Sequence, residues 1–180
     1  GGKPMLCHTD ISRYRNFDAM PAPAAGKKRT RPFLKIQDGC DCFCAYCIVP
    51  YTRGRSRSLP VASVLSEFSA LAESNAPEIV LTGVHIGRYG RDLSPKTGLA
   101  GLLALLDAID GRHRIRLSSI EPAELTDELL QAVYSAEKIC PHFHVPLQSG
   151  DAGILKEIRR PYDPETFVDR VETLRNLFPD

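Results

Sequence analysis

The sequence predicts an α/β fold in which parallel strands alternate with helices. Short apolar segments recur along the chain, and each precedes a stretch whose apolar residues repeat at helical spacing. We count four such βα units between residues 32 and 180, followed by one extra C-terminal helix. Alternation of this kind is typical of right-handed βαβ units, which place the helices outside a curved parallel sheet.

The first two units cover residues 31–109. A strand is predicted at residues 31–39, RPFLKIQDG, and a helix at residues 61–75. The apolar side chains that share one face of this helix are Val61, Val64, Leu65, Phe68 and Leu71. The segment EIVLTG, residues 78–83, predicts a second strand, and GLAGLLALLDAI, residues 98–109, predicts the helix that follows.

The last two units carry helix-capping signals. A third strand is predicted at residues 114–122, and Thr126 is placed to cap the next helix. A fourth strand is predicted at residues 142–150, HFHVPLQSG, with Asp151 capping its helix. Asp163-Pro164 predicts the start of the last helix, whose expected buried face holds Phe167, Val168, Val171, Leu174 and Leu177.

The chain therefore divides into two predicted parts. Residues 1–31 have no clear period and are rich in Pro, Ala, Gly and cations, so we expect a linker or irregular N-terminal segment. Residues 32–180 form the predicted core domain. Four βα units are too few to close an eight-stranded barrel, so we expect a partial, truncated barrel.

Composition and charge narrow the function classes. The 180 residues are 43% hydrophobic and 25% charged, as in a globular domain, and no apolar run reaches the length of a membrane span. We therefore expect no membrane partner and a cytoplasmic location. Residues 1–60 hold 11 Lys and Arg against 4 Asp and Glu, and this basic region fits either an RNA contact or a solvated linker.

Four of the six cysteines lie within eight residues, which indicates metal or cluster binding. Cys40, Cys44 and Cys47 have the spacing C-x3-C-x2-C. Three thiolates on a four-iron cluster would leave one iron open to a small molecule, whereas a structural zinc would need a fourth ligand. Cys42 is a spare thiol for zinc, but its position between two motif cysteines predicts that its side chain points away.

The remaining zinc candidates are Cys140, His142 and His144. Both histidines are expected on one face of the fourth strand, where interior packing competes with metal binding. His85 follows the second strand as either a ligand contact or a structural histidine. Arg53, Arg55 and Arg57 follow the cysteines and are suited to an anionic cluster or a phosphate.

The motif GCDCFCAYCIVPYTRGRSRS resembles the cluster loop of radical-SAM methylthiotransferases. The resemblance continues through LTGVHIGRYG, RIRLSSIEP and HFHVPLQSGDAGILKEIRRPY, and covers residues 32–180. Within that family, these segments resemble the branch that methylthiolates N6-threonylcarbamoyladenosine beside the tRNA anticodon more than the branches acting on isopentenyladenosine or a ribosomal-protein aspartate.

The resemblance implies a radical-SAM barrel that binds a 4Fe-4S cluster on Cys40, Cys44 and Cys47 together with S-adenosylmethionine. It implies a second 4Fe-4S cluster in a domain absent here, tRNA as partner of the full-length protein, and an electron donor such as flavodoxin or ferredoxin. A transferase is expected, although this fragment alone is expected to be inactive. The alternatives are another radical-SAM activity or a non-catalytic zinc-binding interaction module.

The resemblance also assigns S-adenosylmethionine contacts at the strand ends. They are Tyr46 against the adenine, Thr82, Gly83 and Val84 near the methionyl amine, Ser118, Glu121, Gln148 and Ser149 near the ribose or amine, and Arg160 at the methionyl carboxylate. Ordinary alternatives stay open for several of them. Glu121 is equally suited to an ion pair with Arg114 or Arg116, and Gln148 and Ser149 to a turn before Asp151.

Overall fold

The structure is a computed structural model that describes residues 10–14, 17 and 30–179. Most of the predicted linker, residues 1–31, therefore lies outside the described residues. The elements are η1 (Ile11–Arg13), β1 (Phe33–Asp38), α1 (Val49–Thr52), β2 (Arg57–Ser58), α2 (Val61–Glu73), β3 (Glu78–Gly83), η2 (Ile86–Arg88), α3 (Leu99–Asp107), β4 (Arg114–Leu117), η3 (Pro122–Glu124), α4 (Asp127–Ser135), α5 (Ala152–Glu157) and α6 (Pro164–Leu177).

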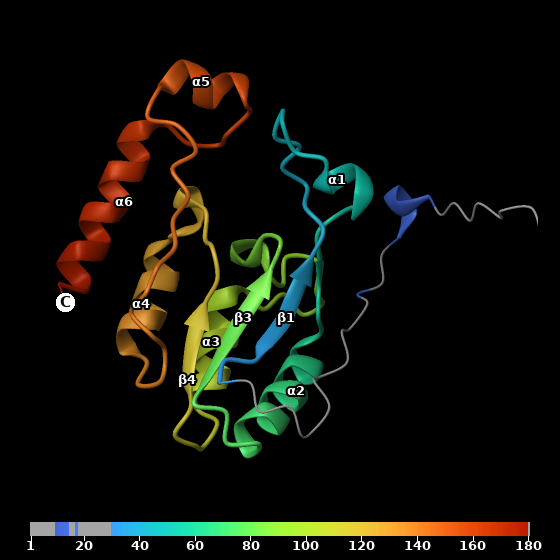
Figure 1. Ribbon diagram of the computed structural model, residues 1–180, viewed down its shortest axis with the longest axis vertical. Coiled ribbons are helices and arrows are strands. Elements are labelled where there is room, and N and C mark those ends of the chain that lie inside the picture. Colours follow the sequence, from blue (N-terminus) through green and yellow to red (C-terminus); the bar gives the residue numbers. More distant parts are fainter. Residues whose placement is uncertain (1–9, 15–16, 18–29, 180) are drawn as a thin grey trace, which may run out of the picture.

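The predicted α/β class is confirmed by a four-stranded, mostly parallel sheet in the order β2-β1-β3-β4. Strand β3 lies parallel to both β1 and β4, with Leu34 opposite Leu81 and Ile79 opposite Ile115. The short strand β2 was not predicted, and it pairs antiparallel with the end of β1. Figure 1 shows the arrowheads of β1, β3 and β4 pointing the same way, so their carboxyl ends share one edge of the sheet.

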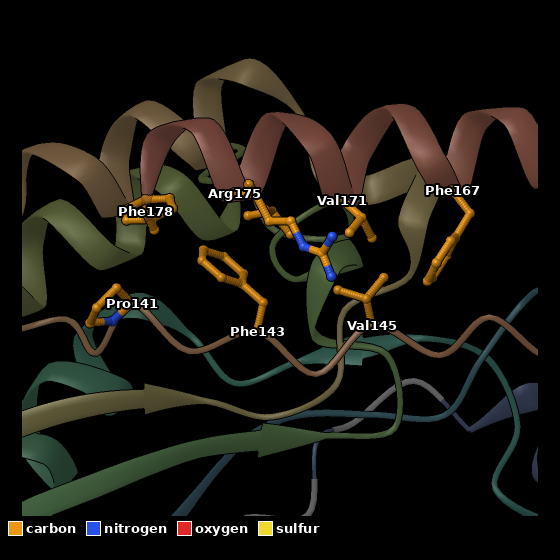
Figure 2. A pocket seen from close by; sticks show the side chains of 8 residues that line it. Pro141, Phe143, Val145, Phe167, Val171, Arg175 and Phe178 are labelled. Atoms are coloured by element: carbon orange, nitrogen blue, oxygen red, sulfur yellow. The ribbon is translucent and has the colours of Figure 1, made fainter. Parts of the chain in front are cut away.

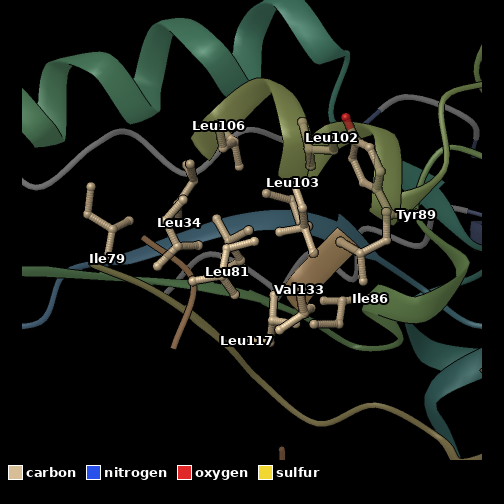
Figure 3. Close-up of a cluster of buried hydrophobic side chains, with 14 of the residues drawn as sticks. Leu34, Ile79, Leu81, Ile86, Tyr89, Leu102, Leu103, Leu106, Leu117 and Val133 are labelled. Atoms are coloured by element: carbon tan, nitrogen blue, oxygen red, sulfur yellow. The ribbon is translucent and has the colours of Figure 1, made fainter. Parts of the chain in front are cut away.

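Alternation along the strands buries one face of this sheet under helices. The residues of β1, β3 and β4 on that face are Leu34, Ile36, Ile79, Leu81, Ile115 and Leu117. They join a core with Phe68 of α2, Leu102, Leu103 and Leu106 of α3, and Val133 of α4. Figure 3 shows the leucines of α3 above the strand side chains. The helices therefore lie on the outside of the sheet, as the βαβ pattern predicts.

The fourth predicted strand, residues 142–150, is wrong. This segment makes a single parallel bridge, between His144 and Ser119, and an earlier bridge joins Ile139 to Ile115. The chain follows the edge of β4 without forming a ladder. Pro141 precedes the segment and Pro146 lies within it, and neither residue has the backbone N–H that a strand pairing needs.

The predicted helix caps are confirmed. Thr126, Asp151 and Asp163 each accept a hydrogen bond from the backbone N–H three residues later. Burial of α6 is less than predicted, because only Leu174 is buried and Val168 is 53% exposed.

The apolar side of α6 instead borders a groove of about 300 Å³. Figure 2 shows Phe143 and Val145 of the preceding segment facing this side of the helix. No helix in the described part of the chain is both long and apolar enough to cross a bilayer.

Candidate active site

The cysteine loop begins where β1 ends. Gly39 adopts a positive φ of 69°, and a Cβ there would lie 2.0 Å from the carbonyl oxygen of Arg55, so only glycine fits. The backbone N–H of Cys40 then donates to Gly54 at 3.1 Å, which closes the loop on itself. The loop rises beyond the arrowhead of β1 together with α1, opposite α5 (Figure 1).

The three motif cysteines lie on this one loop. Cys44 is buried, whereas Cys40 and Cys47 are half-buried. A turn joins the last two, with the N–H of Cys47 donating to the carbonyl of Cys44 at 2.9 Å. Ala45 also donates to Ile158, which ties the loop to the end of α5. The cysteines therefore sit at the carboxyl edge of the sheet, where chemistry is found in parallel α/β folds.

Cys42 does not point away from the site as predicted. Its Sγ lies 3.5 Å from Nδ1 of His85, and Sγ of Cys40 lies at the same distance from that nitrogen. The ligand atoms of Cys40, Cys42 and His85 all lie within 4.8 Å of one another. In the part of the chain that the structure describes, this is the group of three whose spacing suits a single metal ion, and it excludes Cys44 and Cys47.

His85 is buried and held on both sides. Its backbone N–H donates to Oε1 of Gln37 at 2.7 Å, and its Nε2 lies 2.6 Å from Oε2 of Glu124. Arg88 pairs with the other oxygen of this carboxylate at 3.1 Å. Burial lowers the pKa of His85, but the contacts with Cys40 and Glu124 outweigh it and raise that pKa to about 9.

The same contacts separate the two neighbouring thiols. A hydrogen bond from the Cys42 thiol, followed by the contact with His85, lowers the pKa of Cys40 to about 4 despite its burial. The hydrogen bond to Cys40 and burial together raise the pKa of Cys42. In the metal-free chain, Cys40 is therefore the thiolate and Cys42 the donor.

Arg160 connects three of the predicted site residues. Its Nη1 donates to Sγ of Cys44 at 3.2 Å, and its Nη2 donates to Oε2 of Glu121 at 2.5 Å. The Arg160 side chain is 6% exposed. Glu121 thus pairs with Arg160 rather than with Arg114 or Arg116, and Arg116 pairs with Glu78 instead.

Tyr46 and Gln148 also meet, although they are 102 positions apart in the sequence. The Tyr46 hydroxyl donates to Oε1 of Gln148 at 3.1 Å, and the Tyr46 ring is 59% exposed. Ser149 performs the turn chemistry that was its alternative, because its hydroxyl accepts from the N–H of Asp151 at 3.1 Å. The roles of these residues toward a ligand remain predictions.

The end of β3 is shaped by close packing. A Cβ on Gly83 would lie 2.7 Å from the carbonyl oxygen of Gln37, so this glycine allows β3 to approach β1. Thr82 is half-buried beside it, and Val84 is 37% exposed beyond it. The need for glycine at this position thus comes from the neighbouring strand.

A cavity of about 420 Å³ opens on the sheet face that the helices leave uncovered. Ser118, His142 and His144 line it, together with Phe33 and Arg116. The Ser118 hydroxyl is buried and lacks a hydrogen-bond partner among the described residues, which is unusual for a buried polar atom. Both histidines line this cavity, but both are exposed, so the predicted interior packing is wrong; neither belongs to a metal-binding group among the described residues.

The three arginines after the cysteine loop have separate roles. Arg57 is buried, donates to the carbonyls of Arg53 and Arg55, and pairs with Asp38, so it is structural and unavailable to phosphate. Arg53 also pairs with Asp38, at 3.3 Å, but its side chain is more than half exposed. Arg53 and Arg55 therefore remain the surface cations of this loop.

Two residues of the site were missed by sequence reasoning. Gln37 is fully buried and donates to the carbonyls of Asp38 and Gly39, so it fixes the start of the cysteine loop. Glu124 is buried and holds His85. Gln37 could have been found from the sequence, because a polar residue at the end of a buried strand is unusual. No local sequence pattern indicates that Glu124 pairs with His85.

The donor set fits an iron–sulfur cluster on the three motif cysteines. Each thiolate of such a cluster binds a different iron, so Cys40, Cys44 and Cys47 have no need to contact one another. Arg160 at Cys44 and the imidazole of His85 at Cys40 place positive charge beside the sulfurs. Cations and hydrogen-bond donors at the sulfurs suit an anionic cluster.

The chain is similar to a family of known proteins. The model of the family described as "Radical SAM superfamily" matches residues 34–180. The chain is 41% identical over 178 residues to a threonylcarbamoyladenosine tRNA methylthiotransferase, MtaB, from Bacillus subtilis (strain 168). It is 39% identical over 158 residues to a tRNA-2-methylthio-N(6)-dimethylallyladenosine synthase from Clostridium botulinum (strain Loch Maree / Type A3).

These alignments cover 98% and 88% of this chain but 39% and 35% of the relatives, so the chain spans under two fifths of their length. Among solved structures, the radical S-adenosylmethionine methyltransferase TsrM from Kitasatospora setae, with cobalamin and a [4Fe-4S] cluster bound, superposes with a TM-score of 0.62. It shares 17% identity, and the match covers 80% of this chain and 28% of TsrM. OxsB with aqua-cobalamin bound gives a TM-score of 0.65 at 15% identity, over 81% of this chain and 22% of OxsB.

Proposed function

Since this chain belongs to the radical SAM superfamily, we propose that it is the core of a tRNA methylthiotransferase that adds a methylthio group to C2 of N6-threonylcarbamoyladenosine. The observation that carries the proposal is the C-x3-C-x2-C loop at the carboxyl edge of a parallel sheet. The 41% identity with the Bacillus subtilis enzyme, over 98% of this chain, supports the choice of nucleoside.

When bound, a 4Fe-4S cluster with one open iron supplies the electron that cleaves S-adenosylmethionine. Cys40, Cys44 and Cys47 would hold the cluster. Arg160 donates to the Cys44 sulfur and stands beside Glu121, so it fixes one corner of the site and is charged to attract a carboxylate.

The remaining assigned residues would orient S-adenosylmethionine. Tyr46, fixed by Gln148, offers an exposed ring for stacking against a purine. The Ser118 hydroxyl, which has no hydrogen-bond partner among the described residues, is available to bond a ribose or amine. Thr82, Val84 and Ser149 lie at the same edge, and the cavity beside Ser118 offers space for a ligand.

A second candidate is methylthiolation of N6-dimethylallyladenosine. The 39% identity with the Clostridium botulinum enzyme favours it nearly as strongly as the first. For either nucleoside, the full-length protein would use tRNA as its partner and an electron donor such as flavodoxin or ferredoxin. Both substrates present an adenine C2, so the two candidates share every residue named above.

The cluster is tested on this chain. Anaerobic reconstitution with iron and sulfide is expected to load about four irons and give a paramagnetic signal on reduction that changes when S-adenosylmethionine is added. Cys44→Ser is expected to lose the cluster, whereas Cys140→Ser, at a buried cysteine outside the loop, is expected to keep it. A wild-type chain that binds stoichiometric zinc and no iron under these conditions would eliminate the proposal.

The substrate is tested with the full-length protein that contains this chain. It is produced in bacteria that lack their own methylthiotransferases, and tRNA nucleosides are analysed by mass spectrometry. A methylthio group on threonylcarbamoyladenosine supports the first candidate, and one on dimethylallyladenosine supports the second. Modification of neither, by a protein with its clusters loaded, would contradict both.

A further inference from the structure

Cys40, Cys42 and His85 form a ligand set that the iron–sulfur proposal does not use as a group. Cys42 lies outside the C-x3-C-x2-C spacing, yet its sulfur is turned toward the same imidazole nitrogen as Cys40. We propose that the cluster-free chain binds one divalent zinc ion through Sγ of Cys40, Sγ of Cys42 and Nδ1 of His85, and that this ion excludes the cluster.

The distances fit a tetrahedral ion. Zn–S bonds of about 2.3 Å and Zn–N bonds of about 2.0–2.1 Å place a sulfur and a nitrogen ligand roughly 3.6 Å apart. Both sulfurs lie 3.5 Å from Nδ1 of His85. The two sulfurs lie within 4.8 Å of each other, and a shared zinc would hold them roughly 3.8 Å apart. Only a small movement of the half-buried Cys42 is therefore required.

His85 is oriented as a metal ligand. Its Nε2 lies 2.6 Å from the buried carboxylate of Glu124, so Nδ1 is the nitrogen left to face the thiols. Histidines that bind metals usually contact a carboxylate or carbonyl through the other ring nitrogen, which fixes the ring and makes it a better ligand. Gly87 leaves room for this arrangement, because a Cβ there would lie 2.1 Å from Oε2 of Glu124.

The ligand chemistry selects the ion. Two thiolates and one imidazole suit zinc, whereas magnesium and calcium prefer oxygen ligands. Cys42 and His85 also line a cavity of about 90 Å³, which is large enough for the water that would complete a four-coordinate zinc. Because Cys40 would serve both the zinc and the cluster, binding of one blocks the other.

The test uses Co²⁺, which takes zinc sites and gives visible absorption from tetrahedral thiolate coordination. The reduced, metal-free chain is titrated anaerobically with CoCl₂ and is expected to bind one equivalent, which Zn²⁺ then displaces. Cys42→Ser should weaken binding at least about 100-fold and halve the sulfur-to-cobalt band, and Glu124→Gln should weaken binding about 10- to 100-fold. Helical circular dichroism checks the fold of each variant.

The matched control is the double variant Cys44→Ser/Cys47→Ser, which cannot hold the cluster on three thiolates but keeps all three zinc ligands. It is expected to bind Co²⁺ as the wild type does. Loss of Co²⁺ in this variant, or unchanged binding in Cys42→Ser, would overturn the proposal. Co²⁺ binding by the cluster-loaded wild type would also overturn the proposal, because Cys40 cannot be a ligand of the cluster and of the cobalt ion at the same time.

The outcome is separable from that of the proposed function. Cys42→Ser should still load the iron–sulfur cluster, because it keeps Cys40, Cys44 and Cys47. A chain that binds Co²⁺ but never iron and sulfide would support the zinc site and contradict the cluster. A chain that loads the cluster but does not bind Co²⁺ in its metal-free form would support the cluster and contradict the zinc site.

Discussion

The two faces of the β1-β3-β4 sheet differ in what they bury. On the helix-covered face, Ile36, Ile79 and Leu81 are fully buried against α2 and α3. On the other face, Phe33 is 56% exposed, and Arg116 forms an ion pair with Glu78 beside a 420 Å³ cavity. The first face supplies the stability of the domain, and the second leaves space for a ligand.

The largest expected contrast comes from one residue type on the two faces. Phe68 is fully buried in the core, so Phe68→Ala should lower the free energy of unfolding by about 3–5 kcal/mol. Phe33→Ala, at the exposed position, should lower it by less than about 1 kcal/mol. Urea denaturation followed by circular dichroism measures both.

Equal effects of the two substitutions would contradict the comparison. They would mean that the cavity-side face is as tightly packed as the core. A loss of about 3–5 kcal/mol is a large part of the stability of a typical domain, so Phe68→Ala is measured at low temperature.

The covered face is also the part that the sequence predicts well. Strand β3 lies at the predicted residues, and α2 and α3 lie within one or two residues of their predicted ends, because burial on one face imposes a clear apolar period. The open face has no such requirement. The predicted fourth strand fails there, since two prolines and a single neighbouring strand leave residues 142–147 without a ladder.

The candidate site also has one part that the sequence predicts and one part that it does not. The spacing of Cys40, Cys44 and Cys47 is visible in the sequence, and so is their position after a strand. The pairing of Arg160 with Cys44 and of His85 with Cys42 depends on loops that meet only in the folded chain. Glutamate is usually exposed, and no local sequence pattern predicts that Glu124 is buried.

The second prediction concerns thiol chemistry at the edge of the sheet. The pKa of Cys40 is lowered to about 4 from a usual value of 9.0, chiefly by the hydrogen bond from Cys42, so Cys40 is a thiolate at pH 5.5 in the metal-free chain. Cys42→Ala removes that hydrogen bond and should slow alkylation of Cys40 by iodoacetamide at pH 5.5 about tenfold or more. Mass spectrometry of the digested protein identifies the modified cysteine.

The pH dependence of the alkylation rate checks the direction of the pKa shift of Cys40, and a control variant checks that the shift depends on Cys42. The rate for Cys40 in the wild type should stay level from pH 8 down to pH 5.5 and fall as the pH approaches 4. Cys42→Ala should move that fall to higher pH, and Cys140→Ser should leave it in place. A wild-type rate that already falls between pH 9 and pH 8 would show an ordinary thiol at Cys40. Cys42→Ala should change the free energy of unfolding little, because Cys42 is only half-buried and lies outside the core cluster.

The third prediction compares a threonine at the start of one helix with a threonine at the end of another. Thr126 caps α4, which packs on the covered face, and accepts from the N–H of Leu129 at 3.2 Å. Thr126→Ala should therefore cost about 1 kcal/mol of unfolding free energy. Thr52, at the end of α1 in the site loop, donates to the carbonyl of Ile48 and caps nothing, so Thr52→Ala should have a smaller effect. A larger loss at Thr52 would mean that the site loop stabilises the domain.

The smallest expected effect is in α6, which has one buried residue and is otherwise exposed or half-buried. Arg170 of α6 pairs with Asp127 at 2.9 Å, but the Asp127 side chain is 91% exposed. Water and salt screen such a pair, so Arg170→Gln should change the free energy of unfolding by less than about 0.5 kcal/mol, and less still in 1 M salt. Leu174→Ala, at the one buried residue of the same helix, should cost about 2 kcal/mol or more. If the two variants reversed this order, α6 would be held to the domain by charge, and the division of stability between buried and open surfaces would fail for this helix.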